Sequence, residues 1–112
     1  MDEYQVLWTQ GAEFDIVEII EYIKLDSISQ AGEIFKQISK IAETLETMPF
    51  KGRIVPELQS IGIEKYRELL FKRWRILYKV EENRVYILMI VDANRDVEDL
   101  LFRRLIRVGK ER

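Results

Sequence analysis

The run at residues 66–91, YRELLFKRWRILYKVEENRVYILMIV, constrains the fold more than any other part of the chain. Apolar and polar residues alternate on both sides of Glu82 and Asn83, which predicts two strands joined by a two-residue turn, because asparagine tolerates positive φ. Side chains alternate along a strand, so counting outward from this turn gives the pairs that share one face. These pairs are Val80 with Val85, Tyr78 with Ile87, Ile76 with Met89 and Trp74 with Val91. We expect this face to be buried, with Trp74 and Tyr78 as core aromatics.

The opposite face of the hairpin is expected to stay open. It carries Lys79 beside Tyr86, Leu77 beside Leu88 and Arg75 beside Ile90. A part-apolar face of this kind would form an exposed patch on a monomer, and such patches mark binding sites. We therefore predict that a partner binds at Leu77, Tyr86, Leu88 and Ile90.

Composition narrows the class of protein. With 112 residues, of which 47% are hydrophobic, residues 1–112 form a single domain that needs no metal or disulfide to build a core. The chain has no cysteine and no histidine, which excludes disulfides, thiol chemistry and the usual zinc sites and catalytic triads. We expect no metal and no cofactor. The chain has neither an apolar run of about 20 residues nor the basic start of a signal peptide, so we expect a soluble, cytoplasmic protein with no membrane partner.

Charge is distributed unevenly along the sequence. Residues 1–50 hold 3 basic and 10 acidic side chains, whereas residues 51–112 hold 15 basic and 10 acidic ones. Several of the cations fall within the short strand region at residues 65–79. The pattern predicts an acidic back and a basic front.

The elements outside the hairpin can also be predicted. Residues 4–8 alternate as a short strand that includes Trp8, and isoleucines from Ile16 to Ile23 repeat at helical spacing. Ser27 with Gln30 forms a capping box for a second amphipathic helix, which we expect to continue to Pro49. Residues 50–65 form a long loop, which is either functional or packed onto the core by Ile54, Val55 and Leu58 while its other residues only connect. The last helix follows residue 96 and carries Arg103 among its cations.

The motifs MPFKGRIVPEL, YREL, WRILYKV, RVYILMI and DANRD, in this order over nearly the whole chain, resemble the RelE/ParE superfamily of type II toxins. The resemblance implies an α+β fold of order β-α-α-β-β-β-α. Its antiparallel sheet packs on an N-terminal α-hairpin and is followed by a C-terminal helix. It also implies a cognate antitoxin that wraps and neutralises the toxin, with a toxin–antitoxin heterotetramer as one assembly.

The superfamily contains two activities, and both remain open at this stage. One branch cleaves messenger RNA on the ribosome, and the ParE branch poisons DNA gyrase without being a nuclease. By resemblance, Arg75 and Arg95 match arginines that hold the scissile phosphate, and Glu57 matches a carboxylate used as general base. The acid that nucleases place near the last helix is missing, because Phe102 cannot donate a proton.

We therefore predict a ParE-like toxin that binds DNA gyrase and is not an enzyme, with a ribosome-dependent mRNA endoribonuclease as the alternative. A family member without toxicity is a third, weaker interpretation. A glutamate in the position of Glu57 is more often a loop carboxylate paired with Arg53 or a neighbouring lysine than a general base. Arg67 and Arg103 are further candidates for binding, although the face of Arg67 and Glu68 depends on whether the turn at Lys72 has two or three residues.

Overall fold

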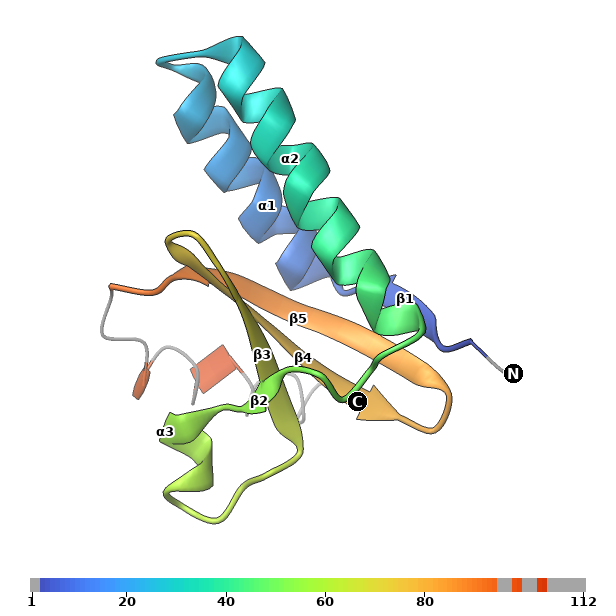
Figure 1. Cartoon of the computed structure of the whole chain (residues 1–112). Coiled ribbons are helices and arrows are strands. Elements are labelled where there is room, and N and C mark those ends of the chain that lie inside the picture. The colour runs from blue at the N-terminus through green and yellow to red at the C-terminus, as the bar shows by residue number, and fades with distance from the viewer. Residues whose placement is uncertain (1–2, 95–97, 100–102, 105–112) are drawn as a thin grey trace.

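The computed structural model describes residues 3–94, 98–99 and 103–104. An α-helical hairpin covers one face of a sheet, and a short helix lies on the opposite side (Figure 1). The elements in chain order are β1 (Gln5–Trp8), α1 (Gln10–Lys24), α2 (Ile28–Glu43), η1 (Thr44–Glu46), β2 (Arg53–Ile54), α3 (Pro56–Gln59), β3 (Tyr66–Phe71), β4 (Trp74–Glu81) and β5 (Arg84–Asp92). The predicted α+β class with its N-terminal α-hairpin is confirmed.

The sheet has five strands in the order β1-β5-β4-β3-β2. The pairs β2–β3, β3–β4 and β4–β5 are antiparallel, whereas β1 runs parallel to β5 with Trp8 opposite Ile87. The predicted antiparallel sheet is therefore found in β2 to β5, and β1 adds a parallel strand at its edge. In the sequence, the α1–α2 hairpin follows β1 and precedes all other strands. It is therefore part of the crossover connection that the parallel pair β1 and β5 requires.

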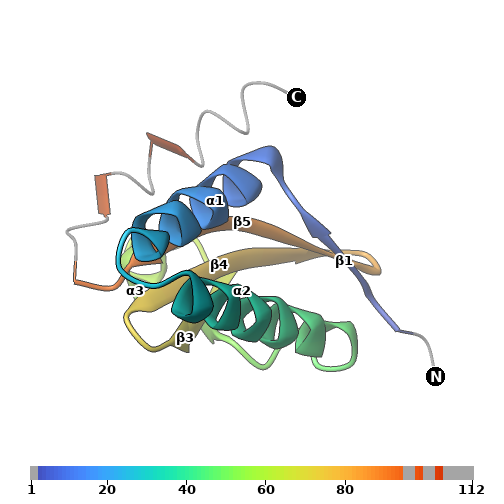
Figure 2. The ribbon, with the colours of Figure 1, turned by 90° about the horizontal axis from the view of Figure 1, so that it is seen from above.

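Both long helices start where side-chain caps satisfy their first free N–H groups. The Ser27 hydroxyl accepts a hydrogen bond from the Gln30 N–H at 3.0 Å, as predicted, and Thr9 caps α1 through the Ala12 N–H at 3.2 Å. The second helix ends at Glu43 and tightens into η1, so the predicted continuation to Pro49 is wrong. Seen from above, α1 and α2 lie side by side over the sheet (Figure 2).

The main core lies between this hairpin and the sheet. From the sheet it receives Trp74, Ile76, Tyr78, Val85 and Ile87, all of them buried as predicted. The helices contribute an apolar stripe to the same core: Ala12, Ile16, Ile34, Ile38, Ala42 and Leu45. The sheet is thereby anchored on one face by helical side chains.

A β-bulge changes the register in the second half of the hairpin. Tyr78 lies opposite Ile87, but Leu77 lies opposite Met89, so Leu88 is an extra residue in β5. Each side chain of β5 after Leu88 therefore lies on the face opposite to the one that strict alternation predicts. The predicted pairs Ile76–Met89 and Trp74–Val91 are wrong, and Ile90 lies opposite Ile76 in the main core.

The bulge occurs where β5 loses its parallel neighbour. β1 ends at Trp8, and the Thr9 hydroxyl then donates to the carbonyl oxygen of Ile87 at 2.9 Å. Past this point no strand lies on the β1 side of β5, and the Ile90 N–H donates instead to Asp15 Oδ2 in α1 at 3.0 Å. A helical carboxylate therefore replaces the missing ladder hydrogen bond.

The other face of the sheet has a smaller core of its own. Val55 precedes α3 and Leu58 lies within it. Both side chains cover Leu77, Met89 and Val91. The strand β2 and the helix α3 fall inside the predicted long loop, and the alternative that Val55 and Leu58 pack it onto the core is confirmed. The loop is thus a packed cover for this face.

The tight turns fix which side chains share a face. Both are two-residue turns, and Lys72 and Glu82 have φ of 53° and 54°. The two-residue turn at Glu82 and Asn83 is confirmed, although the positive φ falls on Glu82. The turn at Lys72 places Arg67 beside Tyr78 and Glu68 beside Leu77, on opposite faces.

Of the predicted C-terminal helix, the described residues 98–99 and 103–104 are helical. The remainder of that helix, together with Arg95 and Phe102, lies outside the described residues. None of the helices described is long and apolar enough to cross a membrane.

Candidate functional site

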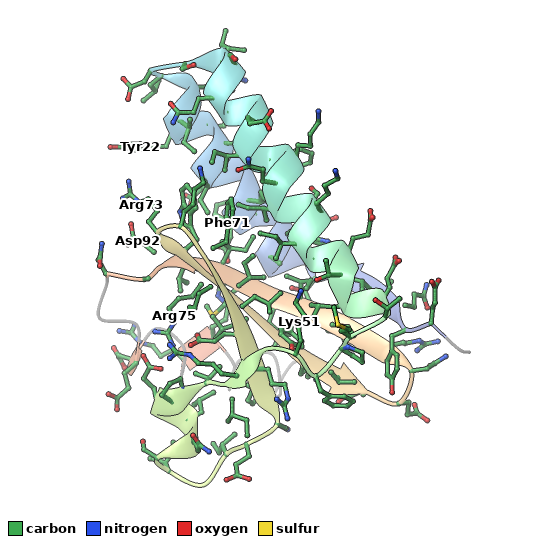
Figure 3. All side chains as sticks on the ribbon, viewed as in Figure 1. Tyr22, Lys51, Phe71, Arg73, Arg75 and Asp92 are labelled. Carbon is green, nitrogen blue, oxygen red and sulfur yellow. The ribbon has the colours of Figure 1, made fainter. Side chains whose placement is uncertain are left out.

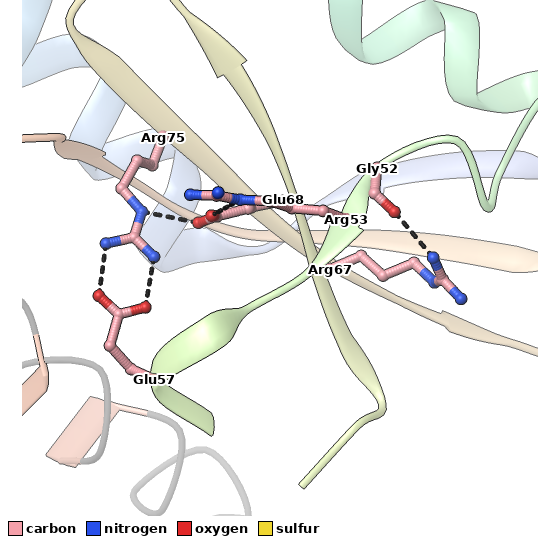
Figure 4. A network of polar contacts seen from close by, with 6 residues as sticks. All are labelled: Gly52, Arg53, Glu57, Arg67, Glu68 and Arg75. Atoms are coloured by element: carbon pink, nitrogen blue, oxygen red, sulfur yellow. Dashed lines mark hydrogen bonds and ion pairs between the residues drawn. The ribbon is translucent and has the colours of Figure 1, made fainter. Parts of the chain in front are cut away.

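A four-residue ionic network, which contains two of the three predicted catalytic residues, lies on the face covered by α3 (Figure 4). Arg75, at the start of β4, donates from Nη1 to Glu57 Oε2 at 2.7 Å and from Nη2 to Glu57 Oε1 at 2.6 Å. Parallel hydrogen bonds of this kind between a guanidinium and a carboxylate are among the strongest that side chains form. The structure therefore brings Arg75 and Glu57 together, but as partners of each other.

Glu68 holds the other side of the network. Its Oε1 accepts from Arg75 Nε and its Oε2 accepts from Arg53 Nε, each at 2.6 Å. The Glu68 side chain is 0% exposed and that of Arg75 is 7% exposed. A buried carboxylate is tolerated here because two guanidinium groups compensate its charge. The interpretation of Glu57 as an ion-paired loop carboxylate holds, but its partner is Arg75, and Arg53 binds Glu68.

The backbone around the network is fixed by close packing. The Gly52 N–H donates to the Tyr78 hydroxyl at 2.9 Å, and a Cβ at Gly52 would lie 2.6 Å from the carbonyl oxygen of Glu68. Val55 N–H donates to the Tyr66 carbonyl oxygen at 2.9 Å, and Pro56 then occupies the first turn of α3. These contacts place Glu57 over the sheet directly opposite Arg75.

The electrostatics of the network oppose a catalytic role for either residue. Hydrogen bonds from Arg75 hold the pKa of Glu57 below its ordinary value, which weakens it as a general base near neutral pH. The same hydrogen bonds raise the pKa of Arg75 above its ordinary value. Its charge is directed at two carboxylates, and an incoming phosphate would have to displace them.

The remaining predicted cations have different surroundings. Arg67 donates from Nη1 to the carbonyl oxygens of Gly52 at 2.7 Å and Phe50 at 3.2 Å, and its guanidinium carbon lies 5.4 Å from the centre of the Phe50 ring. Arg67 therefore holds the loop that follows η1. Arg103 is exposed and forms an ion pair with Asp99 one helical turn earlier. Arg95 lies outside the described residues.

The predicted exposed patch does not exist as such. Leu77, Leu88 and Ile90 are all buried, and Tyr86 alone of the four is partly exposed. Leu77 is covered by the α3 loop and Ile90 by the helical hairpin after the bulge. The prediction of an open binding face is wrong because Val55 and Leu58 pack on this side of the sheet and because the bulge turns Ile90 to the other face.

Two features of this face were missed or incomplete in the sequence analysis. Glu68 is the central carboxylate, and its position could be read only once the turn at Lys72 was known. Lys79 lies between Tyr66 and Tyr86 on the neighbouring strands, with its Nζ 5.7 Å from the centre of the Tyr86 ring and 3.2 Å from Glu81. The alternating pattern did place Lys79 beside Tyr86, but the Tyr66 register again required the turn.

Comparisons with known proteins identify the family. A family model described as the ParE toxin of type II toxin–antitoxin systems, parDE, matches residues 6–97. The chain belongs to this ParE toxin family. A comparison with curated protein sequences finds no match.

Solved structures agree with the ParE assignment at the level of the fold. A chain of the chromosomal ParDE toxin–antitoxin system from P. aeruginosa superposes with a TM-score of 0.68 at 19% identity, covering 82% of this chain and 98% of that chain. A chain of the RelBE2 toxin–antitoxin complex from Mycobacterium tuberculosis gives a TM-score of 0.59 at 20% identity, covering 84% and 97%. At these identities the likeness shows a shared fold and no more.

Proposed function

We propose that this ParE-family toxin inhibits growth by binding a protein target, DNA gyrase, and that a cognate antitoxin neutralises it. Membership of the ParE family supports the first part, and structural likeness to chains of toxin–antitoxin complexes supports the second. Gyrase is a cytoplasmic enzyme, so the toxin acts in the cytoplasm. A toxin–antitoxin heterotetramer is the assembly we propose for the neutralised form.

The observation that carries the choice of a protein target is the pairing of Glu57 with Arg75. A ribonuclease of this superfamily would need a free cation for the phosphate and an unpaired base for the 2′-hydroxyl. Here the bidentate pair satisfies both groups internally, and Glu68 engages the same arginine from the other side. The network has no net charge, which weakens any attraction to RNA phosphates on this face.

The test separates the two activities first in one bacterial strain and then with purified components. The protein is induced in a bacterial host, and plasmid supercoiling and mRNA integrity are followed from the same cultures. Purified protein is then assayed with gyrase, and separately with ribosomes programmed with mRNA. We expect loss of gyrase supercoiling with intact mRNA.

Glu57→Gln serves as the control in both assays, because it keeps the shape of the side chain while removing its charge. A gyrase poison should retain most of its activity in this variant, since the carboxylate is engaged internally. Ribosome-dependent cleavage of mRNA by the wild type, lost in Glu57→Gln and in Arg95→Ala, would overturn the proposal and establish the endoribonuclease.

A further inference from the structure

The α1–α2 hairpin carries most of the exposed apolar side chains of the described residues. Of the ten large hydrophobic side chains that are exposed there, six lie on α1, on α2 or in the turn between them: Phe14, Val17, Tyr22, Leu25, Ile28 and Phe35. Figure 3 shows the side chains that stand out from these helices, with Tyr22 pointing away from them into solvent. Exposed apolar side chains gathered on one element mark an interaction surface.

The outer face of the hairpin, which we define by Phe14, Val17, Ile28 and Phe35, contains a hollow of about 160 Å³. Its lining comes from α1 and α2 alone and includes Val17 and Phe35, which are 59% and 50% exposed. The two helices run antiparallel (Figure 2), so the shared hollow fixes their relative height. Val17 is level with Phe35, and residues toward the start of α1 are level with residues toward the end of α2.

The two helices carry opposite charges beside this hollow. Glu13 lies one turn before Val17 on α1, whereas Lys36 and Lys40 follow Phe35 on α2. Glu13 and the two lysines are exposed, and none of them forms an ion pair within the part of the chain that the structure describes. Glu13 is level with the stretch of α2 that holds the lysines. A face with an acid on one helix and lysines at the same height on the other is complementary to itself under a twofold rotation.

We propose that the toxin forms a homodimer through the outer face of its hairpin, with the twofold axis parallel to the helices. The α1 helix of each copy lies over α2 of the other, so the four helices form a bundle in which every neighbouring pair is antiparallel. Phe35 of each copy lies over Val17 of the other. Glu13 of each copy lies beside Lys36 and Lys40 of the other. This assembly of the free toxin is independent of the proposed function, whose partners are gyrase and an antitoxin.

The area of the outer face sets the strength of the dimer. The two helices have 15 and 16 residues, so the face is ~22 Å long and, with two helices side by side, ~20 Å wide. The interface therefore covers roughly 900 Å² when both copies are counted, and interfaces below about 1,200 Å² belong to weak associations. We expect a monomer–dimer equilibrium with a dissociation constant of about 10 to 100 μM.

The first test measures dimerisation of the full-length wild type by sedimentation equilibrium from ~1 to ~500 μM, a range that brackets the expected dissociation constant. The double variant Val17→Gln with Phe35→Gln should remain monomeric, because it removes the central apolar contact. The matched control is Ile61→Gln with Leu70→Gln, which changes two side chains that are 55% and 57% exposed outside the hairpin. It should dimerise as the wild type does. Circular dichroism checks that both variants are folded.

Two outcomes of this first test would overturn the proposal. One is a wild type that stays monomeric over the whole range. The other is a folded hairpin variant that dimerises as tightly as the wild type, which would place any association on another surface.

Charge reversal tests the arrangement of the two copies. Glu13→Lys alone, and Lys36→Glu with Lys40→Glu alone, each set like charges against each other at both ends of the interface. Each variant by itself should dimerise ~10-fold more weakly than the wild type, and the loss should shrink at high salt.

An equimolar mixture of the two charge variants gives the decisive result. In a mixed dimer, opposite charges meet again at both ends, so the mixture should associate about as tightly as the wild type. Sedimentation velocity with one variant fluorescently labelled detects the mixed species. A mixture that stays as monomeric as its components would overturn the twofold arrangement of α1 over α2.

Discussion

Glu57 and Arg75 join α3 to the central strand β4 through two parallel hydrogen bonds, of 2.6 and 2.7 Å. Because Arg75 also donates to Glu68, a short helix on a loop is connected to two strands through one guanidinium group. Val55 and Leu58, on either side of Glu57 in the sequence, pack in the small core with Leu77 and Met89. Glu57 and Arg75, which resemble residues of a nuclease site, thus connect α3 to the sheet here. The following predictions test this structural role.

Arg75→Ala should destabilise the protein by about 3 kcal/mol or more, since it removes a partner from the fully buried Glu68. Urea unfolding followed by circular dichroism measures the change. The double variant Arg75→Met with Glu68→Leu should recover much of the loss, because apolar side chains of similar size can replace a buried ion pair. A single variant as stable as the wild type would show that the network contributes nothing to the fold.

Glu57 gives the network a pH dependence of known sign. Arg75 lowers the folded-state pKa of Glu57 below the ordinary value of 4.5, so the unfolded chain binds a proton first as pH falls. The stabilisation is present at neutral pH and is lost as pH drops from about 4.5 through the lower folded-state pKa. We expect the difference in Tm between the wild type and Glu57→Gln to narrow from pH 6 to pH 3. A constant difference over this range would contradict the pairing.

The elements set by local rules could be read from the sequence. The helical stripes, the Ser27 cap and the two-residue hairpin turn each depend on residues close together in the sequence. All three are found, although the second helix ends at Glu43 and not at Pro49. The buried side chains nearest the hairpin turn, from Tyr78 to Ile87, are also placed correctly.

The errors begin where distant segments decide the geometry. The bulge at Leu88 depends on where β1 ends and on a carboxylate supplied by α1, and neither leaves a trace in the alternation of β5. The structure of the long loop depends on Glu57 meeting Arg75 across 18 positions of chain. Such partners follow from the assembled sheet, so the sequence alone could not show that Glu57 and Arg75 bind each other.

Asp15, which is buried on α1, should be a stability residue. Asp15→Ala leaves the buried Ile90 N–H without its acceptor and should cost about 1–3 kcal/mol. Asp15→Asn keeps an oxygen that can accept from Ile90 and should lose less, chiefly the contact with Arg104. Amide hydrogen exchange at Ile90 checks the assignment directly. Equal exchange rates in the wild type and Asp15→Ala would contradict the hydrogen bond.

Two glycines provide a matched pair for the packing around the network. A Cβ at Gly52 would lie 2.6 Å from the carbonyl oxygen of Glu68 and 2.7 Å from the Tyr78 hydroxyl, whereas a Cβ at Gly32 in α2 would meet no atom within 4 Å. Gly52→Ala should therefore destabilise by about 1–3 kcal/mol, because the backbone must shift to relieve the contact. Gly32→Ala should stabilise by about 0.5–1 kcal/mol, because alanine favours the helix over glycine.

Thermal unfolding of both glycine variants beside the wild type tests the close approach of the loop to β3 and β4. The expected result is a lower Tm for Gly52→Ala and a higher Tm for Gly32→Ala. Displacement of Gly52 should also weaken the contact of Arg67 with the Gly52 carbonyl oxygen, which lies at 2.7 Å. If Gly52→Ala instead raised Tm as Gly32→Ala does, the loop could not lie against the sheet at this distance, and the positions of β2 and α3 would have to be revised.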